Sequence, residues 1–496
     1  MAAIPRRAAR GLPHLRSVNR LGFWLGLAVF LVLRTLDPPA GLGDAGWATA
    51  AVAALMAVWW FTDAVPAAIT GTLPFLLLPL LGVAKPGEVA ADYMHPVLFL
   101  VIGGAMLGRA LEKWGLHRRL AIAVVSRAGT RPERLLFGLM AATAFVSMWV
   151  NNSATTVMML PIAGALALAA RGAEGEDRDA RNFGAALALS VAVASNIGGF
   201  ATPVGTPVNP VAIGLIDQHF GVRIGFAEWM AFGVPIMLAA LPAAWWFIAR
   251  VVLPFRLPAL APADVLAAIG AQAGQAAPWS GPERRVLALL LATAAGWVTL
   301  PLYEKHLPGV TDAALAVGAA LLLFVLPSGA RGTGSASGPL LEWHDARDAP
   351  WYLVLLLGGG LALADAVGGT GLSRWLGAEL QQLAPAQLFA LVLVVTAICV
   401  LLTECSSNLG TAATFVPIAG ALAIAAGHDP VPVALAAGLA ASWGFANPAG
   451  TSSNAMVIGT GRVRVPEMAG VGALVDLAGV VLIACACAWL VPVVLG

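Results

Sequence analysis

The chain has 496 residues, of which 59% are hydrophobic and 11% are charged. Soluble domains average about 25% charged residues, so this composition excludes a water-soluble globular protein. The formal net charge of +2 gives no reason to expect nucleic acid or another strongly acidic macromolecule as a partner.

Apolar runs of about 17–25 residues recur along the chain, as expected for helices that cross a lipid bilayer. In chain order they lie near residues 20–36, 46–62, 65–83, 95–112, 184–218, 228–252, 284–303, 312–327, 350–367, 430–460 and 467–494. We therefore predict an all-α polytopic membrane protein with about 11 transmembrane helices. Two further apolar segments, 132–170 and 387–427, are each interrupted midway by polar residues and are predicted to be re-entrant helical hairpins.

The N-terminus is basic immediately before the first apolar run, with Arg6, Arg7, Arg10, Arg16 and Arg20. The positive-inside rule places such a segment in the cytoplasm. We expect a multi-pass protein of the cell (inner or plasma) membrane with a cytoplasmic N-terminus.

The sequence contains an internal repeat. PIAGALA occurs at Pro161–Ala167 and again at Pro417–Ala423, an offset of 256 residues (161 to 417) that also relates Asn152 to Asn408. Farther along, Gly199–Gly214 matches Gly444–Gly459 at nine of sixteen positions, with an offset of 245 (199 to 444). If each half crosses the membrane an odd number of times, the two halves are inverted, an arrangement common among secondary transporters.

The repeat divides the chain into four parts. Residues 1–83 are predicted to form an N-terminal cytoplasmic arm and scaffold helices, and 84–255 the first repeat, with hairpin 132–170 and broken helix 184–218. Residues 256–349 are predicted to form a linker and further scaffold helices. Residues 350–496 are predicted to form the second repeat core, with hairpin 387–427, broken helix 430–460 and the last helix.

Four polar clusters interrupt the apolar segments, two in each half: 147–156, 202–210, 403–411 and 447–454. Helix breaks at membrane depth persist only where protein or a water-filled cavity satisfies the exposed backbone. Their carbonyl, amide and hydroxyl oxygens suit a cation such as Na⁺, and the helix N-termini beyond each break suit an anion. Small polar residues also promote close helix packing, but that explanation is weaker for four clusters at equivalent positions of two repeats.

Individual residues near these clusters have several interpretations. Glu404 lies inside the third cluster and is expected to carry a proton, help hold the cation or cap the hairpin tip, with a supporting role favoured. Asp63 ends a predicted span, which favours an interfacial position, and Trp149 and Trp443 are candidates for pocket walls. All four cysteines lie in apolar stretches without CxxC spacing, so we expect neither disulfides nor a cysteine metal site.

In these clusters the chain resembles the divalent anion/sodium symporter family, which includes sodium-coupled di- and tricarboxylate carriers. The resemblance extends from about residue 45 to the C-terminus and is carried by the two hairpin tips, the two breaks and the stretch SATTVMMLPIA. It implies eleven spans, two re-entrant hairpins, a homodimer and an elevator-like transport domain. Na⁺ is implied as the coupling ion, with no other cofactor.

Matched residue by residue, the resemblance assigns two sodium sites and one anion site. The first sodium site is expected at Ser147, Asn151, Asn152 and Gly205, and the second at Thr403, Ser406, Asn408 and Gly450. The small anionic substrate is expected at Asn152, Ser153, Thr206, Asn408, Leu409 and Thr451. Two departures affect the anion: the second tip has Leu409, which forms no side-chain hydrogen bond, and the second break has Ser452-Ser453 where the family often has two prolines.

We therefore expect an elevator-type secondary active transporter that moves a small divalent anion, foremost a C4-dicarboxylate, by Na⁺ symport. The alternatives within this class are a sodium-independent anion exchanger and a proton-coupled oxyanion or sulfate carrier. An ion channel has no need of paired hairpin clusters, and an enzyme is not expected because HExxH and GxSxG motifs are absent.

Overall fold

The computed structural model describes residues 13–171, 177–265, 267, 278–329, 338–347, 349–380 and 387–495, apart from the side chains of a few of them. Arg6, Arg7 and Arg10, on which the N-terminal orientation was predicted, lie outside this part of the chain. The described residues form helices and an isolated β-bridge between Pro327 and Pro339, so the all-helical fold predicted from the sequence is confirmed.

Ten helices in the described part of the chain are long and apolar enough to cross a membrane. They include Asn152–Ala170, Leu388–Cys405 and Asn408–Ala425, which the sequence analysis assigned to the re-entrant hairpins. Length and hydropathy do not distinguish a hairpin arm from a full crossing, because both are about 18 or more apolar residues long. The predicted number of crossings and the inverted repeat therefore stay predictions.

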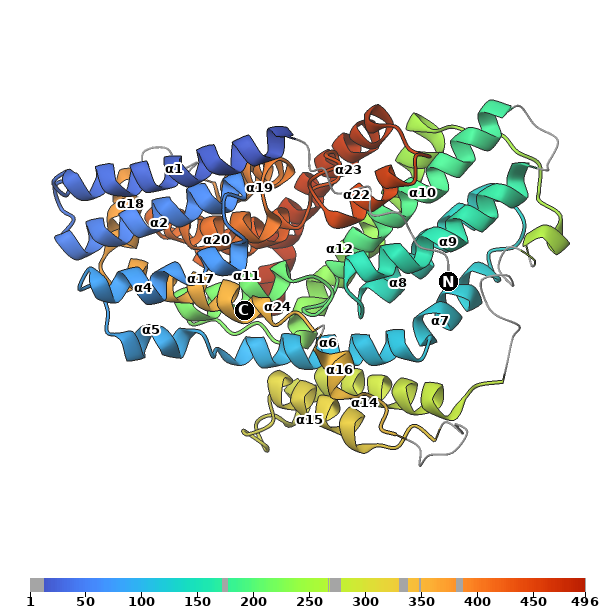
Figure 1. The fold of residues 1–496 in the computed structure, drawn as a ribbon, viewed down its shortest axis with the longest axis horizontal. Coiled ribbons are helices and arrows are strands. Elements are labelled where there is room, and N and C mark those ends of the chain that lie inside the picture. The colour runs from blue at the N-terminus through green and yellow to red at the C-terminus, as the bar shows by residue number, and fades with distance from the viewer. Residues whose placement is uncertain are drawn as a thin grey trace.

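The first part of the chain packs on one side of the molecule (Figure 1). It comprises α1 (Pro13–Thr35), α2 (Asp44–Thr62), α3 (Ala67–Thr70), α4 (Leu73–Leu80) and α5 (Pro86–Asp92). The predicted span 65–83 is interrupted, because the structure divides it into α3 and α4. The division lies where α17 (Tyr352–Gly369) packs against the chain: a side chain on Gly71 would approach the carbonyl oxygen of Leu355 to 2.4 Å.

The central helices carry the first hairpin and the first break. They are α6 (Pro96–Lys113), α7 (Leu116–Val125), α8 (Pro132–Ser147), α9 (Asn152–Arg171), α10 (Asp177–Gly199), α11 (Val208–Phe220), α12 (Phe226–Trp246) and η1 (Phe247–Val252). The apolar part of α10 is completely buried by the surrounding helices, so α10 forms the centre of the molecule.

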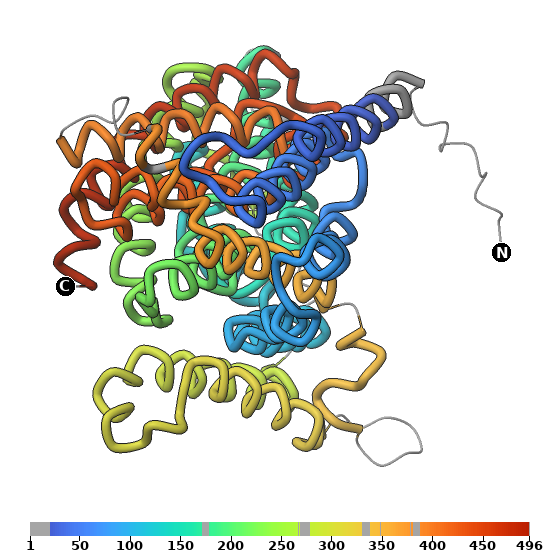
Figure 2. The backbone as a smooth tube through the Cα atoms, turned by 90° about the vertical axis from the view of Figure 1, so that its left-hand side faces the viewer, coloured from blue at the N-terminus to red at the C-terminus, as the bar shows by residue number. Residues whose placement is uncertain are grey.

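A separate pair, α14 (Gly281–Tyr303) and α15 (Asp312–Val325), lies along one edge, next to α6 (Figures 1 and 2). Gly103 allows this contact, because a side chain there would lie 2.6 Å from the backbone of Ala316 in α15. The end of the segment 256–349, predicted as linker and scaffold helices, contains the short helix α16 (Trp343–Ala346).

The second half repeats the order of hairpin, helix and break. Its helices are α17 (Tyr352–Gly369), α18 (Leu372–Leu380), α19 (Leu388–Cys405), α20 (Asn408–Ala425), α21 (Pro430–Ala441), α22 (Ser452–Gly459), α23 (Val465–Cys485), η3 (Ala486–Leu490) and α24 (Val491–Leu495).

Both breaks begin earlier than predicted, since the helices end at Gly199 and Ala441 and resume at Val208 and Ser452. The predicted cluster 202–210 includes Pro203, Pro207 and Pro210, but Pro210 lies in the first turn of α11. Proline is tolerated there because the first backbone N–H groups of a helix have no partner within the helix. The predicted bounds 202–210 and 447–454 are therefore wrong by a few residues.

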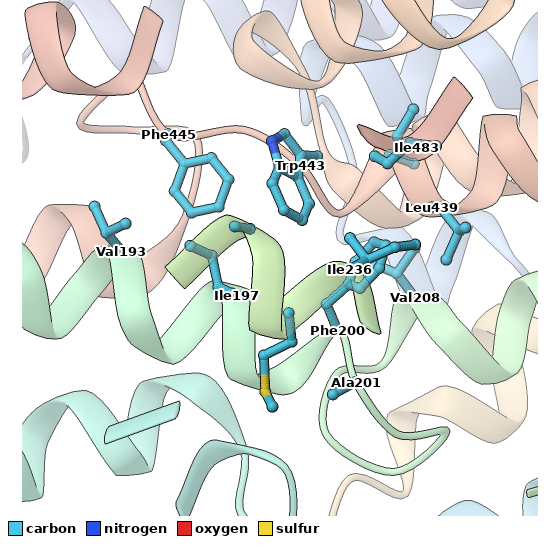
Figure 3. Close-up of a cluster of buried hydrophobic side chains, with 14 of the residues drawn as sticks. Val193, Ile197, Phe200, Ala201, Val208, Ile236, Leu439, Trp443, Phe445 and Ile483 are labelled. Carbon is cyan, nitrogen blue, oxygen red and sulfur yellow. The ribbon is translucent and has the colours of Figure 1, made fainter. Parts of the chain in front are cut away.

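A shared apolar cluster holds the two breaks together (Figure 3). Phe200 of the first break and Trp443 of the second contact each other edge to face, with ring centroids 5.1 Å apart, and Phe445 packs on Trp443 at 5.3 Å. Gly479 of α23 leaves room for Trp443, whose ring nitrogen would lie 1.7 Å from a side chain at that position. The two breaks are thus packed against each other through buried aromatic side chains.

Candidate functional site

The two hairpin tips and the two breaks line one cavity of about 620 Å³. The four helices that follow them are α9, α11, α20 and α22. Each begins at a residue that lines this cavity: Asn152, Val208, Asn408 and Ser452. A helix N-terminus carries a partial positive charge and unpaired backbone N–H groups. Four such ends around one cavity make it suited to an anion.

The structure brings all six candidate anion residues together: Asn152, Ser153, Thr206, Asn408, Leu409 and Thr451 all line the cavity. Of the candidate sodium residues, Asn151, Asn152, Ser406, Asn408 and Gly450 also line it. Ser147 and Thr403 are completely buried and do not line the cavity. Gly205 lines an adjoining cavity of about 320 Å³. Their roles in binding stay predictions.

At the first tip, oxygen atoms converge on the side chain of Asn152. Ser147 Oγ donates a hydrogen bond to Asn152 Oδ1 at 2.8 Å. The same amide oxygen lies 3.1 Å from the carbonyl oxygen of Ser195 and 3.3 Å from that of Gly205. Acceptor oxygens this close repel one another unless a donor or a cation lies among them. Turned over, the amide instead donates to both carbonyls, so these oxygens suit either the Asn152 nitrogen or, with the amide oxygen inward, a cation.

At the second tip the same pattern recurs 256 residues later. Thr403 Oγ1 lies 2.7 Å from Asn408 Oδ1 and 2.6 Å from the carbonyl oxygen of Ala441. Ser406 Oγ lies 2.9 Å from Thr411 Oγ1. The Thr403–Asn408 contact corresponds by the repeat offset to the Ser147–Asn152 contact, so the two tips present the same kind of uncharged oxygen atoms.

Two asparagine side chains hold the broken backbone in place. Asn209 Nδ2 donates to the carbonyl oxygens of Gly199 at 3.1 Å and Thr202 at 2.7 Å. At the equivalent place, Asn454 Nδ2 donates to the carbonyl oxygen of Asn447 at 3.0 Å. These amides satisfy carbonyls that the interrupted helix leaves without partners. Their role is to fix the breaks, because both side chains are almost fully buried.

Among the described residues that line the cavity, the charged ones are two carboxylates, Asp63 and Glu404, and none is lysine, arginine or histidine. Asp63 ends α2 in the left-handed conformation, with φ of 47°, as expected for a residue that ends a span. Glu404 Oε1 accepts a hydrogen bond from the backbone N–H of Ala446 at 2.8 Å, and its Oε2 accepts one from Asn447 at 2.6 Å. Glu404 thus anchors the second break to the second hairpin, which agrees with the supporting role favoured for it.

Sequence reasoning missed Asn196, a residue of α10 that lines the cavity and is only 5% exposed. Its side chain joins the two halves, because it accepts from Asn152 Nδ2 at 3.2 Å and donates to Thr451 Oγ1 at 3.3 Å. Comparison of the repeats hides it, since the equivalent position in the second half is Ala441. The sequence feature that could have indicated Asn196 is the polar pair Ser195-Asn196 near the end of an apolar helix, shortly before the break.

Other hydroxyl groups also form contacts between the first and the second half of the chain. Ser153 Oγ lies 2.5 Å from Ser452 Oγ, and Ser195 Oγ donates to Ser453 Oγ at 3.3 Å. The two candidate wall residues differ: Trp149 lines the adjoining cavity, whereas Trp443 does not line the main one and packs in the core beneath it (Figure 3).

Comparison with known proteins identifies the family to which the chain belongs. The family model for the sodium:sulfate symporter transmembrane region matches residues 18–495. The chain belongs to the sodium:sulfate symporter family. This confirms the resemblance carried by the tips and breaks, and it makes the chain a multi-pass membrane transporter.

Two members of this family are the sodium-dependent dicarboxylate transporters SdcS of Staphylococcus saprophyticus and Staphylococcus aureus. They are 34% and 32% identical to this chain over 482 residues, covering 96% of this chain and 92% of each relative. Among solved structures, the YdaH transporter of Alcanivorax borkumensis is similar with a TM-score of 0.56 over 96% of this chain and 98% of that one. At 15% identity, this likeness concerns the fold alone.

Proposed function

We propose that this protein is a secondary active transporter that carries a C4-dicarboxylate across the cell membrane together with Na⁺. The observation that carries the proposal is the cavity on which four helix N-termini converge and whose lining includes no basic side chain. A dianion held there without lysine or arginine needs cations nearby, and the oxygen clusters at both tips supply places for them. The dicarboxylate relatives support the choice of substrate class.

The proposed cycle follows from this dependence. Na⁺ binds first at Ser147, Asn151, Asn152 and Gly205 and at Thr403, Ser406, Asn408 and Gly450, which orders the tips and breaks. The anion then binds between the tips, so each ligand raises the affinity of the other. The loaded hairpins and broken helices move together across the bilayer, in an elevator-type movement within a homodimer whose N-termini lie in the cytoplasm.

Ligand binding to the folded protein raises its thermal stability, which gives a direct test. We expect succinate to raise the melting temperature of the purified protein in NaCl and to have no effect when choline replaces Na⁺. Malate, citrate, aspartate and sulfate define the specificity in the same assay. Stabilisation by sulfate but not by succinate contradicts the dicarboxylate assignment and favours an oxyanion carrier.

Leu409 lines the cavity at the second tip, where a hydroxyl is missing. We expect Leu409→Thr to lower the KM for succinate roughly fivefold, because one added hydrogen bond contributes about 1 kcal/mol. Leu409→Val is the matched control, since valine has nearly the shape of threonine without the hydroxyl. Equal KM values for the two variants, measured by uptake, contradict a substrate contact at this position.

A further inference from the structure

A chain of three side chains crosses from the first half of the protein to the second. It begins at Asn152, the first residue of α9, passes through Asn196 of α10 and ends at Thr451, the N-cap of α22. Asn152 Nδ2 donates to Asn196 Oδ1 at 3.2 Å, and Asn196 Nδ2 donates to Thr451 Oγ1 at 3.3 Å. We name these three residues the amide relay.

Rotation of the Asn152 amide by 180° exchanges its oxygen and nitrogen, so two orientations with different partners are available to it. In the first, its oxygen faces Ser147 Oγ and the carbonyl oxygens of Ser195 and Gly205 at 2.8, 3.1 and 3.3 Å. A cation among these oxygens favours that orientation. In the second, the Asn152 nitrogen donates to the same two carbonyls, and its oxygen lies 3.2 Å from the side chain of Asn196. The atom that it then faces is Asn196 Oδ1, also an acceptor, so this second orientation suits a site without a cation only if the Asn196 amide turns as well.

The orientation of Asn152 determines that of Asn196. When Asn152 presents its nitrogen, Asn196 accepts through Oδ1 and directs its own nitrogen to Thr451, as observed. When Asn152 presents its oxygen, Asn196 must turn its nitrogen toward Asn152 and its oxygen toward Thr451. A planar amide has its donor and acceptor on opposite sides, so the two contacts exchange together.

The orientation of Asn196 in turn determines what the Thr451 hydroxyl offers to the cavity. Thr451 Oγ1 accepts from Asn196 Nδ2 and from the backbone N–H of Asn454, the latter at 3.1 Å. A hydroxyl accepts two hydrogen bonds and donates one. With both acceptor positions used, its proton is available to an anion in the cavity that Thr451 lines. When Asn196 presents its oxygen instead, that proton is donated to Asn196.

We propose that the amide relay couples the first cation site to the anion: a cation at Asn152 orients Asn196, and Asn196 frees the Thr451 hydroxyl to bind a carboxylate. This inference rests on the proposed function and adds the residue through which the two ligands act on each other. Asn196 is a positioning residue, because it acts through Thr451. Linkage requires the reverse effect as well, so the anion raises Na⁺ affinity through the same residues.

The test is a thermodynamic cycle on the purified full-length protein with succinate as the probe. Succinate affinity is measured by calorimetry at low and at saturating NaCl, and the ratio of the two dissociation constants is the coupling factor. We expect Asn196→Ala to lower this factor about tenfold, because the Thr451 hydroxyl is then available to the anion whether or not Na⁺ is bound, and the difference between the two states is one hydrogen bond to a charged group. Asn182→Ala is the matched control, because Asn182 is also 5% exposed on α10 but bonds to the carbonyl oxygen of Pro254.

A second pair of variants covers the case in which Asn196→Ala does not fold. Thr451→Ser keeps the hydroxyl and is expected to keep the coupling factor, whereas Thr451→Val is expected to lower it about tenfold. In the double variant, the effects of Asn196→Ala and Thr451→Val are expected to overlap rather than add.

The outcomes separate this inference from the proposed function. If succinate affinity of the unmodified protein does not depend on Na⁺, the symport proposal fails. If it does depend on Na⁺ and Asn196→Ala behaves like Asn182→Ala, the amide relay is overturned. Equal coupling factors for Thr451→Ser and Thr451→Val overturn it as well.

Discussion

Replacing Gly205 by alanine is expected to lower sodium-dependent uptake of the anion by roughly 10- to 100-fold, as overpacking a tight site costs about 1–3 kcal/mol. A side chain at Gly205 would lie 2.4 Å from the carbonyl oxygen of Gly199 and 2.8 Å from its Cα. Both are backbone atoms, so the break itself must shift. That shift displaces the Gly205 carbonyl, which faces Asn152. Together with Ser147 Oγ and the Ser195 carbonyl, it forms the first oxygen cluster, at the first hairpin tip.

The second half of the chain provides the matched control. Gly450 is equivalent to Gly205 by the repeat offset, but a side chain there would meet its nearest atom, the carbonyl oxygen of Asn447, at 3.3 Å. Alanine keeps the backbone carbonyl that Gly450 would offer to the second sodium site and requires only a small displacement, so we expect Gly450→Ala to retain uptake within about threefold. Uptake measured in proteoliposomes decides the point, and equal losses in both variants contradict the first oxygen cluster as described.

Glu404→Gln is expected to lower uptake at every pH without changing the shape of the pH profile. The two carboxylate oxygens accept from the backbone N–H groups of Ala446 and Asn447, and glutamine has a single oxygen with which to replace them. One buried donor loses its partner, at a cost of about 1–3 kcal/mol, and the second break loosens from the hairpin. The melting temperature is expected to fall together with uptake.

This prediction separates anchoring from proton coupling. Glu228→Gln is the control, because Glu228 also accepts a backbone N–H bond, from Gly225 at 2.7 Å, but does not line the cavity. A Glu404→Gln variant that transports at the usual rate and has lost its pH dependence contradicts the anchoring role. That result favours the proton-coupled carrier considered among the alternatives.

The sequence located the site because polar residues are conspicuous in an apolar chain and occur there twice. Asn152 and Asn408 were found as a pair, and both line the cavity. The polar clusters do not predict where each break starts. The helices end at Gly199 and Ala441, before the predicted clusters begin at residues 202 and 447. Backbone contacts between distant segments, such as Gly71 with Leu355, divide a helix where local sequence does not indicate it.

Asn196 shows the limit of the repeat comparison. Its importance comes from a contact between the halves, which no pattern within either half encodes. A residue that joins two repeats has no reason to be duplicated, and Ala441 stands at its equivalent position. The charge of Glu404 in an apolar segment marks it as a candidate, but its two backbone partners lie more than forty positions away along the chain, so the sequence does not indicate them.

The central claim is that movement of the anion is driven by Na⁺. The most direct measurement is uptake of radiolabelled succinate into proteoliposomes that contain the purified protein, with and without an inward Na⁺ gradient. We expect succinate to accumulate above its external concentration with the gradient and not when choline replaces Na⁺. Uptake that is independent of Na⁺ and is stimulated by succinate inside the vesicles contradicts the claim and identifies an exchanger.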